Sequence, residues 1–88
     1  MSVAMRAKLK ITQVQKHENS ANETLHFSAV SRSDKYPEDG SDENNTFAKF
    51  SPSASLTLQI ANPNLIGKFA AGEEYYLDFT KVEPKATA

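Results

Sequence analysis

The chain has 88 residues, a length that makes one domain and leaves room for only a thin hydrophobic core. It carries 10 Lys and Arg against 11 Asp and Glu, so the chain as a whole is not a polycation, and non-specific binding to duplex nucleic acid is disfavoured. It has no cysteine, which excludes disulfides and zinc–thiolate sites and leaves self-association as the expected reinforcement of a small core.

Two segments near the N-terminus have the two-residue rhythm of strands. In residues 5–11 apolar side chains alternate with mostly basic ones, and in residues 23–32 apolar side chains alternate with polar ones. The segment between them is rich in turn formers, so the pair is predicted to form a β-hairpin with a long loop. Val14 is out of phase with the first strand, which predicts a bulge near Thr12 or Gln13.

The segment 33–45 is an acidic insertion marked by proline and glycine, and its composition predicts a solvated loop. We expect an aromatic ring and four carboxylates of this loop to contact a partner: Tyr36, Glu38, Asp39, Asp42 and Glu43. The carboxylates could instead gather a Ca²⁺ ion, but they lack the alternating spacing and the distal Glu of an EF-hand loop. The acidic loop is also complementary in charge to Arg6, Lys8 and Lys10, and it could contact these three residues on a neighbouring subunit.

Residues 46–50 are predicted to form a short strand. Residues 54–61, in which apolar and small polar residues alternate, are predicted to form a longer one. Asn62 and Pro63 then have the pattern of a helix N-cap and a first helical position, followed by apolar residues at helical spacing. We therefore predict a helix of a turn or two that ends before Gly72.

The last strand is predicted over residues 73–82, with Leu77 and its neighbours at two-residue spacing on one face. The tail 83–88 is rich in Pro and Ala and is expected to be disordered. The predicted fold is mainly β: a small antiparallel barrel or sandwich of about five strands, with one short helix before the last strand, in a single domain over residues 5–82. An oligonucleotide-binding barrel is a competing topology, but its helix usually follows the third strand rather than the fourth.

A basic stripe lies on the polar face of the first predicted strand, at Arg6, Lys8 and Lys10. Cations two residues apart on a strand are separated by about 7 Å, near the phosphate repeat of a nucleic acid strand, and Tyr76 on the last strand is a candidate stacking platform. These four residues are the predicted contacts to phosphate or nucleic acid. The competing interpretation is that lysines on an exposed strand prevent edge-to-edge aggregation.

The sequence contains no catalytic motif. It lacks a nucleophile elbow, a glycine-rich phosphate loop and a paired-histidine zinc motif. His17 and His26 are too few and too differently placed to indicate a metal site or a general base. We therefore expect no enzymatic activity, no cofactor and no metal site.

The chain contains four tracts that carry a resemblance: RAKLK (6–10), YPEDGSDENNTFAKFSPSA (36–54), IANP (60–63) and GxxYYxDF (72–79). Together they resemble small uncharacterised proteins encoded by tailed bacteriophages and prophages. The resemblance covers most of the chain from Met5 to Lys81. It implies a phage setting, with Met5 as the natural start and residues 1–4 as an extension, and it assigns no site residues.

Small β-proteins of such genomes commonly work by binding. We therefore expect a non-enzymatic protein that acts by binding or assembly as a homo-oligomer, with a phage structural protein or a host protein as a further partner. The expected location is the host cytoplasm or the virion, without a membrane partner, because no window approaches the roughly 18 apolar residues that a membrane span needs. Two alternatives stay open: a single-stranded nucleic-acid-binding protein, and an anti-defence protein that captures a nucleotide or blocks a host enzyme.

Overall fold

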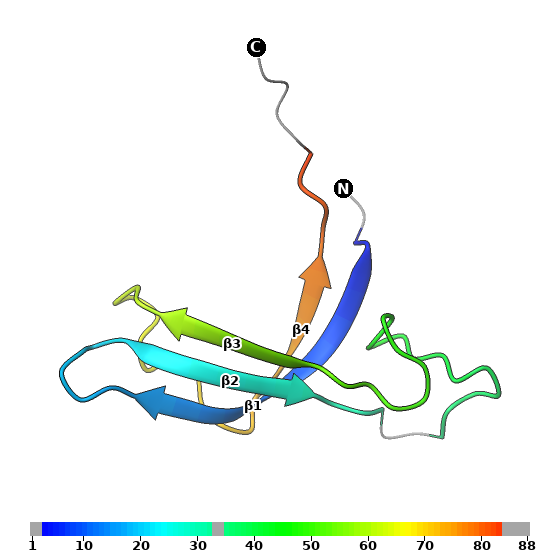
Figure 1. The fold of residues 1–88 in the computed structure, drawn as a ribbon, viewed down its shortest axis with the longest axis horizontal. Coiled ribbons are helices and arrows are strands. Elements are labelled where there is room, and N and C mark those ends of the chain that lie inside the picture. Colours follow the sequence, from blue (N-terminus) through cyan, green and yellow to red (C-terminus); the bar gives the residue numbers. More distant parts are fainter. Residues whose placement is uncertain (1–2, 33–34, 84–88) are drawn as a thin grey trace, which may run out of the picture.

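The computed structural model describes residues 3–32 and 35–83, which form one antiparallel sheet of four strands. The strands are β1 (Met5–Lys16), β2 (Glu23–Ala29), β3 (Ser55–Ile60) and β4 (Glu74–Phe79), and their order in the sheet is β3-β2-β1-β4. β3 and β4 are therefore the two edge strands. β1 is long and strongly bent, which curls the sheet into a half-barrel (Figure 1). The chain is therefore mainly β, as the sequence predicts, and the predicted hairpin of β1 and β2 is confirmed.

The core lies on the concave face of the sheet, because successive residues of a strand point to opposite faces. Five apolar residues at odd-numbered positions of β1 and β2 are buried there: Ala7, Leu9, Ile11, Leu25 and Phe27. Partly buried residues from the other strands pack against them, among them Leu56, Ile60 and Leu77. The intervening residues, which are mostly polar, lie on the convex face.

The predicted bulge in β1 is confirmed. Ile11 and Gln13 pair with consecutive residues of β2, so Thr12 is the additional residue on β1. The hydroxyl of Thr12 donates to the carbonyl oxygen of His26 at 3.2 Å. The additional residue returns Val14 to the concave face, where it packs against the core.

The predicted short strand at 46–50 is wrong, because this segment forms turns and bends. Its backbone bonds do not form a strand ladder. The N–H of Ala48 donates to the carbonyl oxygen of Asn45 at 3.0 Å, the N–H of Phe50 donates to the carbonyl oxygen of Gly40 at 2.8 Å, and Thr46 alone bonds to β1, at the carbonyl oxygen of Arg6. Phe50 also has a φ of 64°, which lies outside the range of a strand. The described residues therefore form an open sheet of four strands and not a barrel or sandwich of five.

The predicted helix after β3 is also wrong for the described part of the chain, which forms turns there. Asn62 does act as a cap, since its Oδ1 accepts the N–H of Asn64 at 3.0 Å. The N–H groups of Leu65 and Lys68 each donate to a carbonyl oxygen three residues earlier, so the turns follow one another without a helical ladder. Gly67 has a φ of +79°, which ends the helical conformation after its first turn.

Some predicted segments extend outside the described residues. Of the extension 1–4 only the last two residues are described, and of the tail 83–88 only the first. The acidic loop 33–45 is described from Lys35 onwards. Within the described ranges, no helix has the length and apolar character needed to cross a membrane.

Candidate functional site

The concave face of the sheet holds an apolar groove that runs between the two edge strands. Two cavities of about 240 and 180 Å³ share Leu9 of β1, Leu56 of β3 and Leu77 of β4 in their lining. One end of the groove is further lined by Met5, Phe47 and Phe79, and the other by Leu58, Ile60 and Phe69. Both edge strands therefore contribute apolar side chains to one continuous groove.

Much of this lining is in contact with solvent. Leu58 and Phe79 are each 44 % exposed, and Met5, Phe47 and Tyr75 are each 38 % exposed. A sheet normally buries its apolar face against a second layer of structure. The described residues leave the groove open, so Leu58 lies on the same face as the buried Leu25 with which it pairs but is not itself buried.

The segment between β3 and β4 covers one end of the concave face, where Ile11 is fully buried. Phe69 of this segment packs edge-on against Tyr75, with ring centroids 5.7 Å apart. Oε1 of Glu73 accepts the N–H of Ala70 at 2.9 Å and the hydroxyl of Tyr75 at 2.8 Å. These two bonds lower the pKa of Glu73, and the second raises the pKa of the Tyr75 hydroxyl.

Glu23 attaches the same segment to the sheet. It is 2 % exposed at the start of β2, and its two oxygens accept Nζ of Lys16 at 2.7 Å and the N–H of Gly67 at 3.1 Å. Both bonds lower the pKa of Glu23, and the one from Lys16 has the larger effect. Sequence reasoning gave Glu23 no role, although its position in phase with Leu25 and Phe27 is a signal that it points into the buried face.

The acidic loop folds back onto its own chain. The carboxylate of Asp42, which is 4 % exposed, accepts the N–H of Asn44 at 2.9 Å and Nδ2 of Asn45 at 3.1 Å. Asn45 is fully buried; its Oδ1 accepts the N–H of Lys8 and its Nδ2 donates to the carbonyl oxygen of Val30, both at 2.8 Å. Asp42, predicted as a partner contact, is therefore used inside the loop, and the buried Asn45 is a residue that sequence reasoning missed.

Three of the predicted partner contacts in the loop are exposed: Glu38, Asp39 and Glu43. Oδ1 of Asp39 accepts the N–H of Ser41 at 3.0 Å, and hydrogen bonds from Ser41 lower the pKa of Asp39. These carboxylates lie on the outside of a loop that Asp42 and Asn45 hold in place. They are therefore presented to solvent from a defined backbone.

Tyr36, the remaining predicted contact of the loop, belongs to a small aromatic cluster. Its ring centroid lies 6.0 Å from that of Phe50, and the guanidinium carbon of Arg32 lies 5.8 Å from the Tyr36 centroid. The Phe50 ring packs onto Gly40, where a Cβ atom would lie 2.5 Å from the ring. Tyr36 is half-buried, so part of its ring packs inside the loop and part remains exposed on the surface of the loop.

The structure brings the basic stripe next to carboxylates of β4. Arg6 pairs in register with Asp78, and the two form a bidentate ion pair with distances of 2.6 Å from Nε to Oδ1 and 2.9 Å from Nη2 to Oδ2. Nζ of Lys8 lies 3.4 Å from Oε1 of Glu74. The hydrogen bonds of the first pair lower the pKa of Asp78 and raise that of Arg6. Two of the three cations are therefore neutralised on their own sheet, while Lys10 is exposed.

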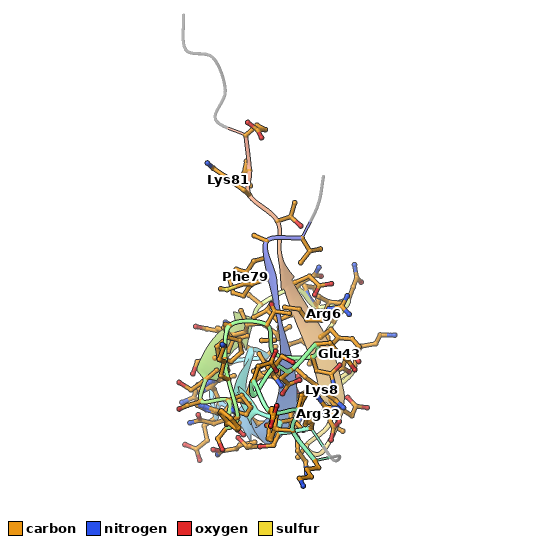
Figure 2. The ribbon with its side chains drawn as sticks, turned by 90° about the vertical axis from the view of Figure 1, so that its right-hand side faces the viewer. Arg6, Lys8, Arg32, Glu43, Phe79 and Lys81 are labelled. Atoms are coloured by element: carbon orange, nitrogen blue, oxygen red, sulfur yellow. The ribbon has the colours of Figure 1, made fainter. Side chains whose placement is uncertain are left out.

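Tyr76 lies in the same cluster on the convex face. The guanidinium carbon of Arg6 lies 4.4 Å from the Tyr76 ring centroid, and the Tyr76 hydroxyl donates to Oδ1 of Asn44 at 3.0 Å. The residue remains 53 % exposed. Figure 2 shows Arg6 and Glu43 on one side of this part of the sheet and Phe79 on the other. The convex cluster, formed by Arg6, Lys8, Glu74, Tyr76 and Asp78, thus lies on the opposite face of the sheet from the buried core, and only Tyr76 of its members also lines the groove.

The described residues contain no group of three or more His, Cys, Asp or Glu side chains arranged to hold a metal ion. The two histidines are hydrogen-bonded within the β1–β2 hairpin. Nε2 of His17 lies 2.7 Å from Oγ1 of Thr24, and Nε2 of His26 lies 3.0 Å from Oε1 of Gln15.

Comparison of the chain with protein-family models, with curated proteins and with solved structures gives no match. The phage setting therefore stays a prediction from the sequence. The function must be argued from the geometry of the groove and the convex cluster.

Proposed function

We propose that this chain is a non-enzymatic protein that acts by binding or assembly as a homo-oligomer, and that the apolar groove is the surface it uses. The observation that carries the proposal is the exposure of the groove, with Leu58 and Phe79 each 44 % exposed on opposite edge strands. Contiguous exposed apolar surface marks sites of protein interaction. In the phage setting that the resemblance implies, the protein is an accessory virion or interaction protein in the host cytoplasm or the virion.

The polar side chains support a binding role over catalysis. In the described part of the chain, the three polar residues that are buried, Glu23, Asp42 and Asn45, are all hydrogen-bonded within the fold. The buried hydroxyl of Tyr36 is the exception, since it has no hydrogen-bond partner there. Buried polar groups with satisfied partners stabilise a fold. The exposed loop carboxylates, Glu38 and its neighbours, are the proposed contacts to a phage structural protein or a host protein.

Light scattering coupled to size-exclusion chromatography tests this proposal over a range of concentrations. We expect a mass that is a multiple of 9.7 kDa and that decreases on dilution. Leu58→Ser removes an exposed leucine of the groove and should shift the protein toward the monomer. Leu65→Ser is the matched control, because Leu65 is 40 % exposed in the segment between β3 and β4, outside the groove lining. A wild-type protein that stays monomeric at high concentration would overturn the homo-oligomer.

The second candidate function is binding of single-stranded nucleic acid by the convex cluster and Lys10. The exposed ring of Tyr76, next to the guanidinium of Arg6, favours it, since exposed aromatic rings beside cations can stack bases. The ion pairs of Arg6 and Lys8 with carboxylates of β4 weigh against nucleic-acid binding, because these carboxylates offset the positive charge that would attract phosphates. Fluorescence anisotropy with a labelled oligonucleotide at low salt separates the two functions.

The anti-defence role, by capture of a nucleotide or by blocking a host enzyme, draws on the phage setting. The groove lining is mainly apolar, which suits the surface of a polypeptide better than the phosphates of a nucleotide. A blocked host enzyme would therefore be the more natural version of this role. Mass spectrometry of the purified protein, which would reveal a bound small molecule, tests the nucleotide version.

A further inference from the structure

The outer side of β3 is a free sheet edge. The N–H of Ala29 donates to the carbonyl oxygen of Ala54 at 3.1 Å, which fixes the alternation of the β2–β3 ladder. The peptide groups of Ser55, Thr57 and Gln59 therefore face away from β2. All three residues are exposed, and within the described part of the chain no strand lies on that side of them.

The composition of β3 leaves this edge unprotected. Its sequence SLTLQI has no charged residue and no proline, whereas free edges are usually protected by charges, prolines or bulges. The other edge strand, β4, carries Glu74 and Asp78. Of the two edges, β3 is thus the one suited to pairing with another strand.

We propose that β3 pairs antiparallel with β3 of a second copy about a two-fold axis at Thr57, so that two half-barrels form one eight-stranded sheet. The inference rests on the proposed function and identifies the partner of the same surface. In this register Thr57 of one copy faces Thr57 of the second copy. Ser55 then faces Gln59 of the second copy, and Leu56 faces Leu58 of the second copy. The axis is perpendicular to the sheet, so both apolar grooves lie on the same side of the joined sheet.

Charge and packing favour this pairing over the alternatives. The cross-strand pairs on the convex side are polar and uncharged, and Thr–Thr pairs are favourable in sheets. On the concave side, each exposed Leu58 gains Leu56 of the second copy as a neighbour. Pairing of two β4 strands about Tyr76 would set Glu74 opposite Asp78, and like charges directly opposite destabilise a sheet. Pairing of β3 with β4 of the next copy would be head-to-tail, and it would leave the carboxylates of Glu74 and Asp78 beside an uncharged strand without cationic partners.

An interface at this edge would cover exposed apolar side chains. Leu58 of β3 is 44 % exposed, and its neighbour Leu56 lines both cavities of the groove. The segment 80–83, which is also exposed, projects beyond the other edge strand, β4 (Figure 1).

Cysteine cross-linking tests the register, because the natural chain has no cysteine. Facing residues of a hydrogen-bonded antiparallel pair have Cα atoms about 5.5 Å apart, which is within the range that a disulfide spans. Thr57→Cys should therefore give a covalent dimer on mild oxidation. Tyr76→Cys, at the centre of the other edge, is the matched control and should stay uncross-linked. A dimer from Tyr76→Cys with none from Thr57→Cys would overturn the proposal in favour of the β4 edge.

Opposite charges at the same position give a second test that does not depend on disulfide geometry. Thr57→Lys and Thr57→Glu place like charges at the axis, so each variant alone should dimerise at least tenfold more weakly than the wild type. An equimolar mixture of the two should recover the dimer, because opposite charges then face each other. A circular dichroism spectrum of each variant like that of the wild type confirms that the monomer still folds.

The outcomes of these tests separate this inference from the proposed function. A wild-type oligomer that neither Thr57 charge variant weakens overturns pairing through β3 and leaves a binding or assembly role through another surface. A wild-type protein that is monomeric at all concentrations overturns both. An oligomer that grows without limit as concentration rises overturns the closed dimer and supports head-to-tail pairing of β3 with β4.

Discussion

The backbone N–H of Lys8 donates to Oδ1 of Asn45 at 2.8 Å, and this bond joins the first part of β1 to the acidic loop. β2 ends at Ala29, so the first residues of β1 have no strand beside them on that side. Thr46 supplies the next contacts, since its N–H donates to the carbonyl oxygen of Arg6 at 2.9 Å and its Oγ1 accepts the N–H of Arg6 at 2.8 Å. The loop therefore takes the place of a strand along this part of β1.

We predict that Asn45→Ala destabilises the protein strongly. The change leaves the N–H of Lys8 and the carbonyl oxygen of Val30 without their partner at a buried position. Each unsatisfied buried group costs about 1–3 kcal/mol, so the loss of both should lower the free energy of unfolding by roughly 2–6 kcal/mol. Urea denaturation followed by circular dichroism measures the change. Asn64→Ala, at an exposed position in the β3–β4 segment, is the control, and an equal loss of stability in both variants would contradict the role of Asn45.

The strands could be predicted because their signal is local. Alternation in residues 5–11 and 23–29 identifies the buried face directly, and the phase change at Val14 identifies the bulge. The acidic loop could not be predicted in the same way. The partners of Asn45 are 37 residues away at Lys8 and 15 residues away at Val30, and nothing in the loop sequence specifies them.

The turn after β3 and the convex cluster show two further limits of the sequence pattern. Asn62 has the chemistry of a helix cap and acts as one, but the positive φ of Gly67 ends the helical conformation that the apolar spacing predicts. Arg6 and Lys8 lie on the polar face as expected. Their neutralisation depends on the register of β1 with β4, which tertiary structure sets and the pattern does not contain.

We predict that Gly40→Ala destabilises the protein more than Gly67→Ala. Both glycines have a positive φ, of +73° and +79°, which costs an alanine about 1–2 kcal/mol. At Gly40 the added Cβ would also lie 2.5 Å from the Phe50 ring, whereas at Gly67 no atom lies within 4 Å. The additional crowding should cost roughly 1–3 kcal/mol, measured as the difference between the two variants in thermal or urea unfolding. Equal effects would show that the Phe50 ring moves away freely.

We predict that removing the carboxylates of β4 increases binding to single-stranded nucleic acid. Glu74→Gln with Asp78→Asn frees Lys8 and Arg6 from their ion pairs and raises the net charge of the convex face by two. Anisotropy with a labelled oligonucleotide should show tighter binding by the double variant, with a steeper dependence on salt than the wild type. Glu38→Gln with Glu83→Gln, two exposed positions outside the cluster, raises the net charge by the same two and controls for overall charge. Tight, salt-dependent binding by the wild type itself would instead support the nucleic-acid function.

We predict that the protein loses stability in acid through Glu23. The folded state lowers the pKa of Glu23 below its ordinary value of 4.5, because Lys16 and the N–H of Gly67 donate to the ionised carboxylate. A carboxyl group with a lowered pKa binds a proton more readily in the unfolded chain. Its stabilising effect is therefore complete above pH 4.5 and is lost as the pH falls through the folded pKa.

Thermal unfolding from about pH 7 to about pH 3 measures this effect. The wild-type midpoint should fall below pH 4.5, with further contributions from Asp78, Asp39 and Glu73, whose pKa values hydrogen bonds also lower. Glu23→Gln should have a lower midpoint at neutral pH and a smaller loss in acid, because the titrating group is gone and an amide cannot replace the ion pair with Lys16. If the midpoints of Glu23→Gln and the wild type fall in parallel through this range, Glu23 does not couple folding to pH.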